Sequence, residues 1–277
     1  MTTIAFWGPR HGQVATTSNL IAVSTGIAMK HQLSTLVSHT HWTRSTLEVA
    51  FKKLESSKDL QLTFSDFGID SLERLAKSHR LNAESIRSNT APLIQGKLDL
   101  LHGTSKPDEH SHQQISNAMP TILNEADKAY DMTFVDVNSG SGNQLSNVVL
   151  NSSDLVVVCL NQNVSLLDNF FNKTEYHEVL NDKKFIIVLG NYHADSKYSA
   201  KNIARKYGVK QKIHTVPHCS PYMDAINDRN VLDFFLRNRN VNKKHETWEF
   251  FNSSAALGNA IIATLGLKGD QQEEGEE

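Results

Sequence analysis

Short apolar runs alternate with segments of helical periodicity along almost the whole chain. Several of these runs are continuous and rich in Val, Ile and Leu, which is typical of parallel strands buried on both faces of a sheet. The apolar runs predict strands at 3–7, 34–39, 97–101, 132–137, 155–160, 185–189 and 212–216. The periodic segments predict helices at 16–30, 71–77, 112–129, 199–207 and 245–265. This alternation predicts an α/β fold, with a doubly wound, mostly parallel sheet and helices on both faces.

The pattern contains no internal repeat and no stretch with the composition of an interdomain linker. A single domain is therefore predicted for residues 1–268, which is enough chain to bury a large hydrophobic core. Residues 269–277 read GDQQEEGEE, and their acidic and amide side chains predict a disordered tail.

The composition, with 39% apolar and 21% charged residues, is that of a soluble globular protein. No apolar stretch approaches the roughly 20 residues that cross a bilayer, and the first residues lack the basic and apolar regions of an export signal. The two cysteines, Cys159 and Cys219, are too few for a disulfide framework. A cytoplasmic protein with reduced thiols is expected.

The loop after the first predicted strand reads GPRHGQVATT and leads directly into a predicted helix. A P-loop, G-x-x-x-x-G-K-[ST], binds phosphates at this place through backbone N–H groups, a lysine and a hydroxyl that contacts magnesium. Aligned on Thr16, the chain has Pro9 and Val14 at the two glycines and Ala15 at the lysine. Two interpretations follow: a nucleotide loop that has lost its chemistry, or an ordinary strand-to-helix turn.

Later segments favour the first interpretation, because they resemble ParA/MinD-type ATPases in order and spacing. The stretch KAYDMTFVDVNSGSGNQL resembles their second switch region, with Asp136 at the end of a strand and Gly140 in the loop. Asn191, in FIIVLGNYH, matches an asparagine that contacts adenine in that family, and Pro217, in IHTVPHCS, matches the loop beside the base. The resemblance covers roughly residues 2–265, although no single motif is intact.

This resemblance implies a P-loop NTPase fold, a homodimer around two nucleotides, and ATP or ADP with Mg²⁺ as the cofactor, unless the chain binds none. The magnesium positions fall on Thr16 and Asp136. The implied nucleotide-binding positions are Gly8, Arg10, Gly12, Thr16, Thr17, Asp136, Gly140, Asn191 and Pro217.

The departures from the family affect its catalytic groups. The family loop K-G-G-V-G-K-T-T is replaced by R-H-G-Q-V-A-T-T. Arg10 stands where a lysine reaches across the dimer, and it keeps the positive charge. Ala15 stands where the second lysine holds the outer phosphates. The family also has Asp-x-Asp after its second strand, where this chain has His39 and His41, so Arg10 and His39 are the only candidates for a catalytic role.

Phosphoryl transfer depends on positioning and charge stabilisation, and each such contact contributes roughly 3–4 kcal/mol. Weak or absent ATP hydrolysis is therefore expected. The imidazoles of His11, His39 and His41 have two interpretations: a transition-metal site, or polar loop side chains in a chain with 13 histidines.

Two functions are compatible with these features. The loops are most similar to degenerate TadZ/CpaE-like proteins, which implies a dimerising scaffold or localisation factor that joins protein partners of a pilus, secretion or mobile-element machine, and reaches a membrane or cell pole only through them. The acidic chain end argues against direct membrane insertion. The alternative is an ATP-cycling, ParA-like positioner that binds DNA non-specifically through a basic face. The residues expected on that face are Lys201, Arg205, Lys206, Arg237, Arg239, Lys243 and Lys244.

Overall fold

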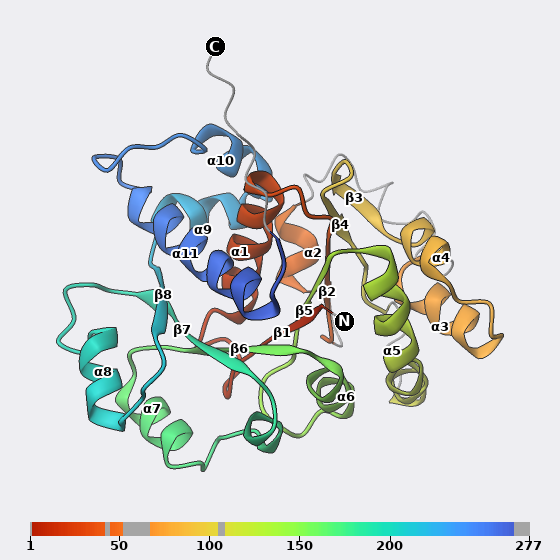
Figure 1. Cartoon of the computed structure of the whole chain (residues 1–277), viewed down its shortest axis with the longest axis horizontal. Coiled ribbons are helices and arrows are strands. Elements are labelled where there is room, and N and C mark those ends of the chain that lie inside the picture. Colours follow the sequence, from red (N-terminus) through yellow and green to blue (C-terminus); the bar gives the residue numbers. More distant parts are fainter. Residues whose placement is uncertain (1, 42–44, 52–66, 105–108, 269–277) are drawn as a thin grey trace.

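A single eight-stranded sheet runs through the centre of the molecule (Figure 1). The structure is a computed structural model that describes residues 2–41, 45–51, 67–104 and 109–268. The strand order is β3-β4-β2-β5-β1-β6-β7-β8, and neighbouring strands are parallel except for the antiparallel pair β3–β4. The predicted parallel sheet is therefore confirmed.

The strands are β1 Thr3–Trp7, β2 Thr35–His39, β3 Ala91–Ile94, β4 Leu98–Leu100, β5 Met132–Asp136, β6 Leu155–Leu160, β7 Phe185–Tyr192 and β8 Ile213–Pro217. The helices are α1 Thr16–Lys30, α2 Thr46–Ala50, α3 Ile69–Lys77, α4 Ala83–Ser88, α5 Glu109–Ala129, α6 Gln144–Ser152, α7 Val164–Phe171, α8 Ala200–Tyr207, α9 Ser220–Asn227, α10 Val231–Arg237 and α11 Trp248–Leu265, with a short 3₁₀ helix at Glu178–Asn181.

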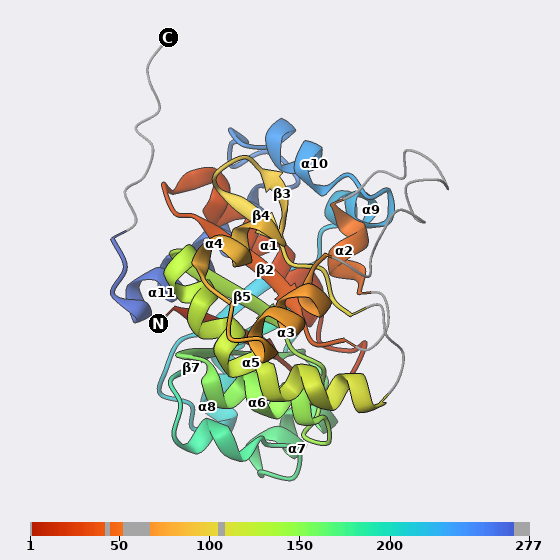
Figure 2. The same ribbon diagram turned by 90° about the vertical axis from the view of Figure 1, so that its right-hand side faces the viewer.

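Helices cover both faces of the sheet, as a doubly wound fold requires (Figures 1 and 2). The helix α1 packs against α11 on one face, and α5 packs against α6 on the other. The strands β1 and β6 are buried along their whole length because helices cover them on both sides. This arrangement confirms the predicted α/β fold class.

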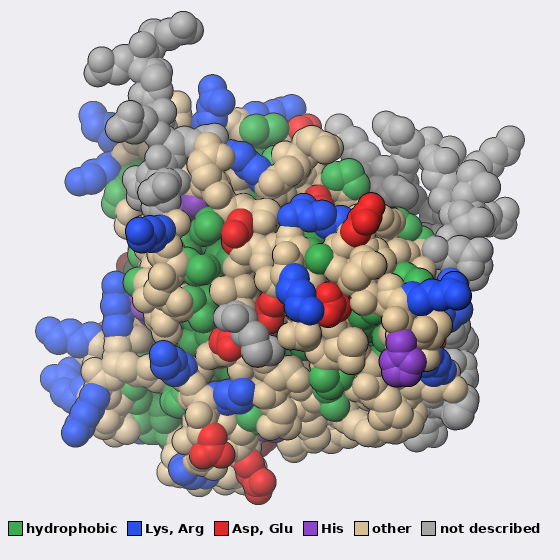
Figure 3. All heavy atoms as spheres, turned by 45° about the vertical axis from the view of Figure 1, so that its right-hand side comes forward, with side chains coloured by type: hydrophobic (Ala, Val, Ile, Leu, Met, Phe, Trp, Pro, Cys, Tyr) green, Lys and Arg blue, Asp and Glu red, His purple; other side chains and the backbone are tan. Residues whose placement is uncertain are grey.

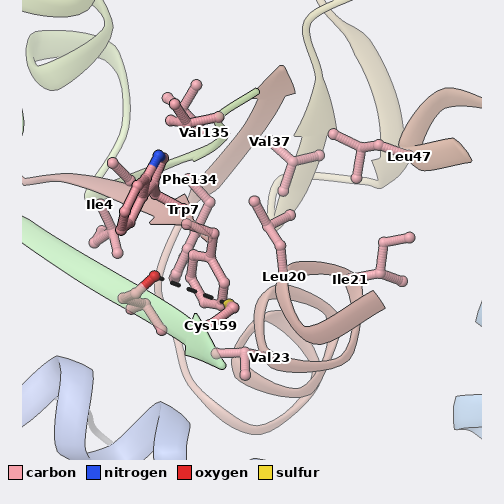
Figure 4. Close-up of a cluster of buried hydrophobic side chains, with 14 of the residues drawn as sticks. Ile4, Trp7, Leu20, Ile21, Val23, Val37, Leu47, Phe134, Val135 and Cys159 are labelled. Atoms are coloured by element: carbon pink, nitrogen blue, oxygen red, sulfur yellow. Dashed lines mark hydrogen bonds between the residues drawn. The ribbon is translucent and has the colours of Figure 1, made fainter. Parts of the chain in front are cut away.

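The central core lies between α1 and the middle strands. Figure 4 shows Phe134 and Cys159 on the strand side, with Leu20 and Val23 of α1 facing them, whereas the indole of Trp7 points to the opposite face of the sheet. All five side chains are almost completely buried. Burial of a large apolar side chain stabilises a fold by about 1.5–3 kcal/mol, so this layer fixes α1, and the loop before it, on the sheet.

The long periodic segments were the best predicted, and α1 has the predicted bounds. The short elements α2, α4, α6, α7, α9 and α10 and the edge strand β3 were not predicted, because few residues carry too little periodicity. The strand β7 continues three residues beyond the predicted 185–189, and the extra residues form an irregular register with β8. The tail at 269–277 lies outside the described residues, and the single domain over 1–268 remains a prediction.

The loop before α1 rests on Gly190 of β7. A Cβ atom on Gly190 would lie 2.7 Å from Nδ2 of Asn19, 2.8 Å from the carbonyl oxygen of Val14 and 3.0 Å from Cβ of Ala15. Backbone atoms such as the Val14 carbonyl cannot move without moving the loop. The position therefore requires glycine for close approach.

Replacing Gly190 with alanine is expected to lower the free energy of unfolding by about 1–3 kcal/mol, as overpacking does in a tight interior. Gly142→Ala is the matched control, because a Cβ there meets nothing within 4 Å. Denaturant unfolding of both variants measures the difference. Equal midpoints for Gly190→Ala and the wild type would show that the loop does not rest on this strand.

Candidate functional site

The carboxyl ends of β1, β2, β5, β6 and β7 meet at one edge of the sheet, where doubly wound folds bind ligands. The loops that leave these strands carry most of the residues predicted for nucleotide binding. Two hydrogen bonds to carbonyl oxygens hold the first loop in place: Nδ2 of Asn161 donates to the carbonyl oxygen of Gln13 at 3.0 Å, and the backbone amide of Gly140 donates to the carbonyl oxygen of Gly8 at 3.2 Å.

The first loop has two left-handed positions, Gly12 at φ 70° and Ala15 at φ 55°. Ala15 is the N-cap of α1 and makes no side-chain cap. Val14, one position earlier, is β-branched and avoids positive φ. Its side chain is 1% exposed, and a Cβ on Gly8 would lie 2.4 Å from its Cγ2. An isopropyl group therefore lies over Gly8, where the family's glycine leaves room for a phosphate.

Arg10 is paired within its own chain. Its Nε lies 2.8 Å from Oε2 of Glu175 and its Nη2 lies 2.6 Å from Oε1, and Asn169 donates to the same carboxylate. The hydrogen bond and charge of Arg10 lower the pKa of Glu175, despite some desolvation. The arginine predicted to reach across a dimer is thus already committed to a carboxylate in cis.

Asp136 is the most deeply buried charged group at this edge, with 0% of the residue exposed. Its Oδ2 accepts hydrogen bonds from the Thr17 hydroxyl at 2.6 Å and from Nε2 of His41 at 3.0 Å. Its Oδ1 is buried and has no hydrogen-bond partner. Burial lowers the pKa of His41, but the hydrogen bond and charge of Asp136 outweigh this and raise it above 6.5.

Thr17, rather than Thr16, is therefore the hydroxyl that reaches Asp136. The side chain of Thr16 turns the other way, and its Oγ1 would lie 3.1 Å from a Cβ on Gly8. It lies on the side of the Cys159 thiol, whose pKa burial raises to about 12. Thr16 and Asp136, the residues predicted to hold magnesium, are consequently not joined to each other in this structure.

The arrangement does not fit magnesium. Mg²⁺ requires six oxygen ligands in near-octahedral geometry and usually keeps several waters. Oδ2 of Asp136 already accepts from Thr17 and His41, and Oδ1 is sealed from solvent. In the described part of the chain, no group of three or more His, Cys, Asp or Glu side chains is placed to hold a metal ion. The transition-metal interpretation of the histidines therefore has no support in that part.

His39 is enclosed by hydrogen bonds. Its Nε2 lies 3.0 Å from Oε1 of Glu48, and its Nδ1 accepts the backbone N–H of His41 at 3.1 Å. Glu48 also accepts the amide of Gly103 at 2.7 Å. Burial raises the pKa of Glu48, but hydrogen bonds from His102, His39 and Gly103 outweigh it and hold this pKa well below its usual range. Because the His39 side chain is 2% exposed and both nitrogens are engaged, it has no free position to accept a proton from water.

The predicted switch loop contacts the first loop. The indole Nε1–H of Trp7 donates to the carbonyl oxygen of Gly140 at 2.9 Å. Gly140 has φ 78°, a left-handed conformation that favours glycine. Gly8 and Gly140, both predicted for nucleotide binding, lie together because the Gly140 amide donates to the Gly8 carbonyl oxygen.

The predicted adenine side is built by the ends of β7 and β8. Asn191 is exposed at φ 46° within the irregular part of β7, and Tyr192 pairs with Pro217 of β8. The rings of His193 and His218 stack at a centroid distance of 5.4 Å. Asn191 and Pro217 are therefore neighbours across two strands, close to the loop that Gly190 supports.

The predicted basic face is divided. Lys201, Arg205 and Lys206 lie on α8, at the lower end of the molecule in Figure 1, and Lys206 pairs with Asp168 at 3.1 Å. Arg237 ends α10, and the segment 238–244 that follows lies at the upper end. On the face drawn in Figure 3, acidic side chains are mixed with basic ones. The structure does not bring the predicted basic residues onto one face, since α8 and the segment that follows α10 lie far apart. Within the described residues, no helix is long and apolar enough to span a membrane.

Several contributors to this edge were not predicted from the sequence. Glu48 and Glu175 bind the two candidate catalytic side chains, and Trp7, Asn161 and Gln162 fasten the loops. Gln162 accepts the amide of His193 at 2.8 Å and donates to the carbonyl oxygens of His193 and Tyr198. Asn161 and Gln162 follow β6 directly, so their place at a strand end was a usable signal. Glu48 and Glu175 carried no such signal in the sequence. Glu48 lies in α2, which was not predicted, and Glu175 is 165 positions from its partner Arg10.

Comparison with known proteins finds similarity only at the level of structure. No protein-family model matches the chain. No curated protein matches it either.

Solved structures of ParA and MinD proteins superpose on nearly the whole chain. A ParA-family ATPase from Chlorobium tepidum has a TM-score of 0.69 at 12% identity, over 93% of this chain and 98% of that one. The septum site-determining protein MinD of Pyrococcus horikoshii, complexed with Mg-ADP, has a TM-score of 0.68 at 12% identity, over 96% and 98%. The MinC:MinD cell division complex of Aquifex aeolicus has a TM-score of 0.65 at 14% identity, over 100% of both chains. This chain has the P-loop NTPase fold of the ParA and MinD ATPases.

Proposed function

We propose that this chain is a degenerate ParA/MinD-like protein that acts as a dimerising scaffold or localisation factor, with weak or absent ATP hydrolysis. The enclosure of His39 is the observation that carries the proposal. Its two nitrogens are engaged by Glu48 and by the His41 amide, so His39 cannot take the part of the aspartate that positions water in the family.

The phosphate loop supports the same conclusion. Ala15 provides no charge at the lysine position, Arg10 is bound to Glu175, and Val14 lies over Gly8. A lost charge-stabilising contact lowers a rate by about 10²–10³-fold. Two such losses in one site leave little of the rate enhancement that phosphoryl transfer requires.

The partners and ligand are proposed from the fold. MinD from Pyrococcus horikoshii is described with Mg-ADP, and MinD from Aquifex aeolicus is described in a complex with MinC. We propose that this chain binds ATP or ADP weakly or not at all, near Gly12, Thr17 and Asn191. In the cytoplasm it would recruit protein partners of a TadZ/CpaE-like pilus, secretion or mobile-element machine, and these would bring it to a membrane or pole.

Calorimetric titration with ATP is expected to show binding no tighter than the millimolar range, about −4 kcal/mol, because the lysine contact is missing. Ala15→Lys is expected to tighten binding, since it returns a cation to the start of α1. Alanine and lysine are similarly strained at this left-handed position, so the wild type and the Ala15→Lys variant differ mainly in charge. Micromolar binding by the wild type would contradict the proposal.

We propose that the homodimer forms with or without nucleotide. Arg10 is neutralised by Glu175, so the face carrying the loop does not need a phosphate from a partner subunit to balance its charge. Sedimentation velocity at tens of micromolar protein, with and without ATP, is expected to give the same dimer. A monomer under both conditions removes the dimer from the proposal.

DNA is the second candidate partner, favoured by the exposed Lys201 and Arg205 on α8. Binding through phosphates would fall steeply between about 50 and 200 mM salt and would hardly depend on sequence. An electrophoretic shift of the wild type that Lys201→Glu/Arg205→Glu abolishes would favour a DNA-bound positioner. Lys243→Glu/Lys244→Glu is the matched control at the other end of the molecule, and no shift at low salt rejects this candidate.

A further inference from the structure

The environment of Asp136 differs from that of a carboxylate that serves a divalent cation. The carboxylate is fully buried, and both hydrogen bonds to Oδ2 come from side chains of this chain, Thr17 and His41. The imidazole Nε2 of His41, 3.0 Å away, together with the Thr17 hydroxyl uses this oxygen as an acceptor, so its lone pairs are directed at side chains of the chain itself.

We infer that His41 takes the place of magnesium beside Asp136, so that the phosphate loop of this chain binds its ligand without a divalent cation. The ligand part of this inference rests on the proposed nucleotide site, whereas the exclusion of magnesium rests on the contacts of Asp136 alone.

The position of the His41 ring is fixed from two sides. On its own backbone, the amide of His41 donates to Nδ1 of His39 at 3.1 Å. His39 in turn is held by Glu48, which also binds the Gly103 amide. On the other side the ring of His11 meets the His41 ring edge-on, with centroids 6.2 Å apart. Rotating the imidazole away would break its hydrogen bond to Asp136 and its ring contacts with His11 and His39.

The remaining oxygen does not offer an alternative route to a cation. Oδ1 of Asp136 is sealed from solvent and has no hydrogen-bond partner. A magnesium ion held at about 2.0–2.1 Å with several waters needs an open approach, which neither oxygen of this carboxylate provides. The hydroxyl that could have joined it, that of Thr16, is turned toward Gly8 and makes no hydrogen bond to Asp136.

Thermal unfolding of metal-free protein, with and without millimolar Mg²⁺, tests the exclusion directly. The wild-type Tm is expected to be unchanged by Mg²⁺. His41→Asp is expected to show a Tm that rises with Mg²⁺, because it removes the imidazole and places a second carboxylate beside Asp136, where a bound cation relieves their repulsion.

Two further variants keep the test decisive if His41→Asp folds poorly. His41→Gln retains a donor of similar reach and is expected to stay insensitive to Mg²⁺, and His11→Ala, which removes only the neighbouring ring, is the matched control. A rise in the wild-type Tm with Mg²⁺ overturns the inference. Insensitivity of a folded His41→Asp variant also overturns it, because His41 would then not be the group that keeps the cation out.

Calorimetric titration with ADP in EDTA and in Mg²⁺ separates this inference from the proposed function. Equal affinity in both conditions supports both ideas. Binding that is at least tenfold tighter with Mg²⁺ overturns the inference and leaves the nucleotide site standing. Absence of ADP binding in both conditions rejects the nucleotide site, and the unfolding measurement then decides alone whether His41 excludes magnesium.

Discussion

The hydrogen bonds to the buried carboxylate of Asp136 hold the ligand-binding edge of this sheet together. Thr17 comes from α1, His41 from the loop after β2, and Asp136 from the end of β5. A hydrogen bond to a charged group contributes about 1.5–3 kcal/mol, and a buried charge that loses its partners costs several kcal/mol. The start of α1 and the loop after β2 are thus tied to the central strand by one side chain.

The contacts that stabilise this edge also occupy the side chains that were candidates for a catalytic role. Glu48 encloses His39, Glu175 binds Arg10, and the side chain of Val14 lies over Gly8. The fold retains the arrangement in which the strand ends, the loops and the first helix of a P-loop protein meet. The side chains at those places form neutral or balanced pairs inside the chain. Binding and recognition can survive such a change, whereas phosphoryl transfer depends on charge aimed at the ligand.

The sequence predicted the parallel sheet and the long helices because continuous apolar runs and sustained periodicity span many residues. It also predicted that Gly8, Gly140 and Asp136 would lie at one edge, since Asp136 ends a strand and the two glycines follow strands. It could not predict which of Thr16 and Thr17 reaches Asp136, because the answer depends on the left-handed backbone of Ala15 and the inward turn of Val14. Nor could it predict the Arg10–Glu175 pair, which joins residues 165 positions apart, or the division of the basic residues between α8 and the segment after α10.

The central claim is that a P-loop NTPase fold remains here without its hydrolytic chemistry. Phosphate release from ATP and Mg²⁺, measured in parallel with an active ATPase of the same fold, tests this most directly. The account predicts that the wild type releases no more phosphate than a protein-free sample. Release well above that level that disappears in His39→Ala would contradict it, because His39 would then act on water despite its two hydrogen bonds.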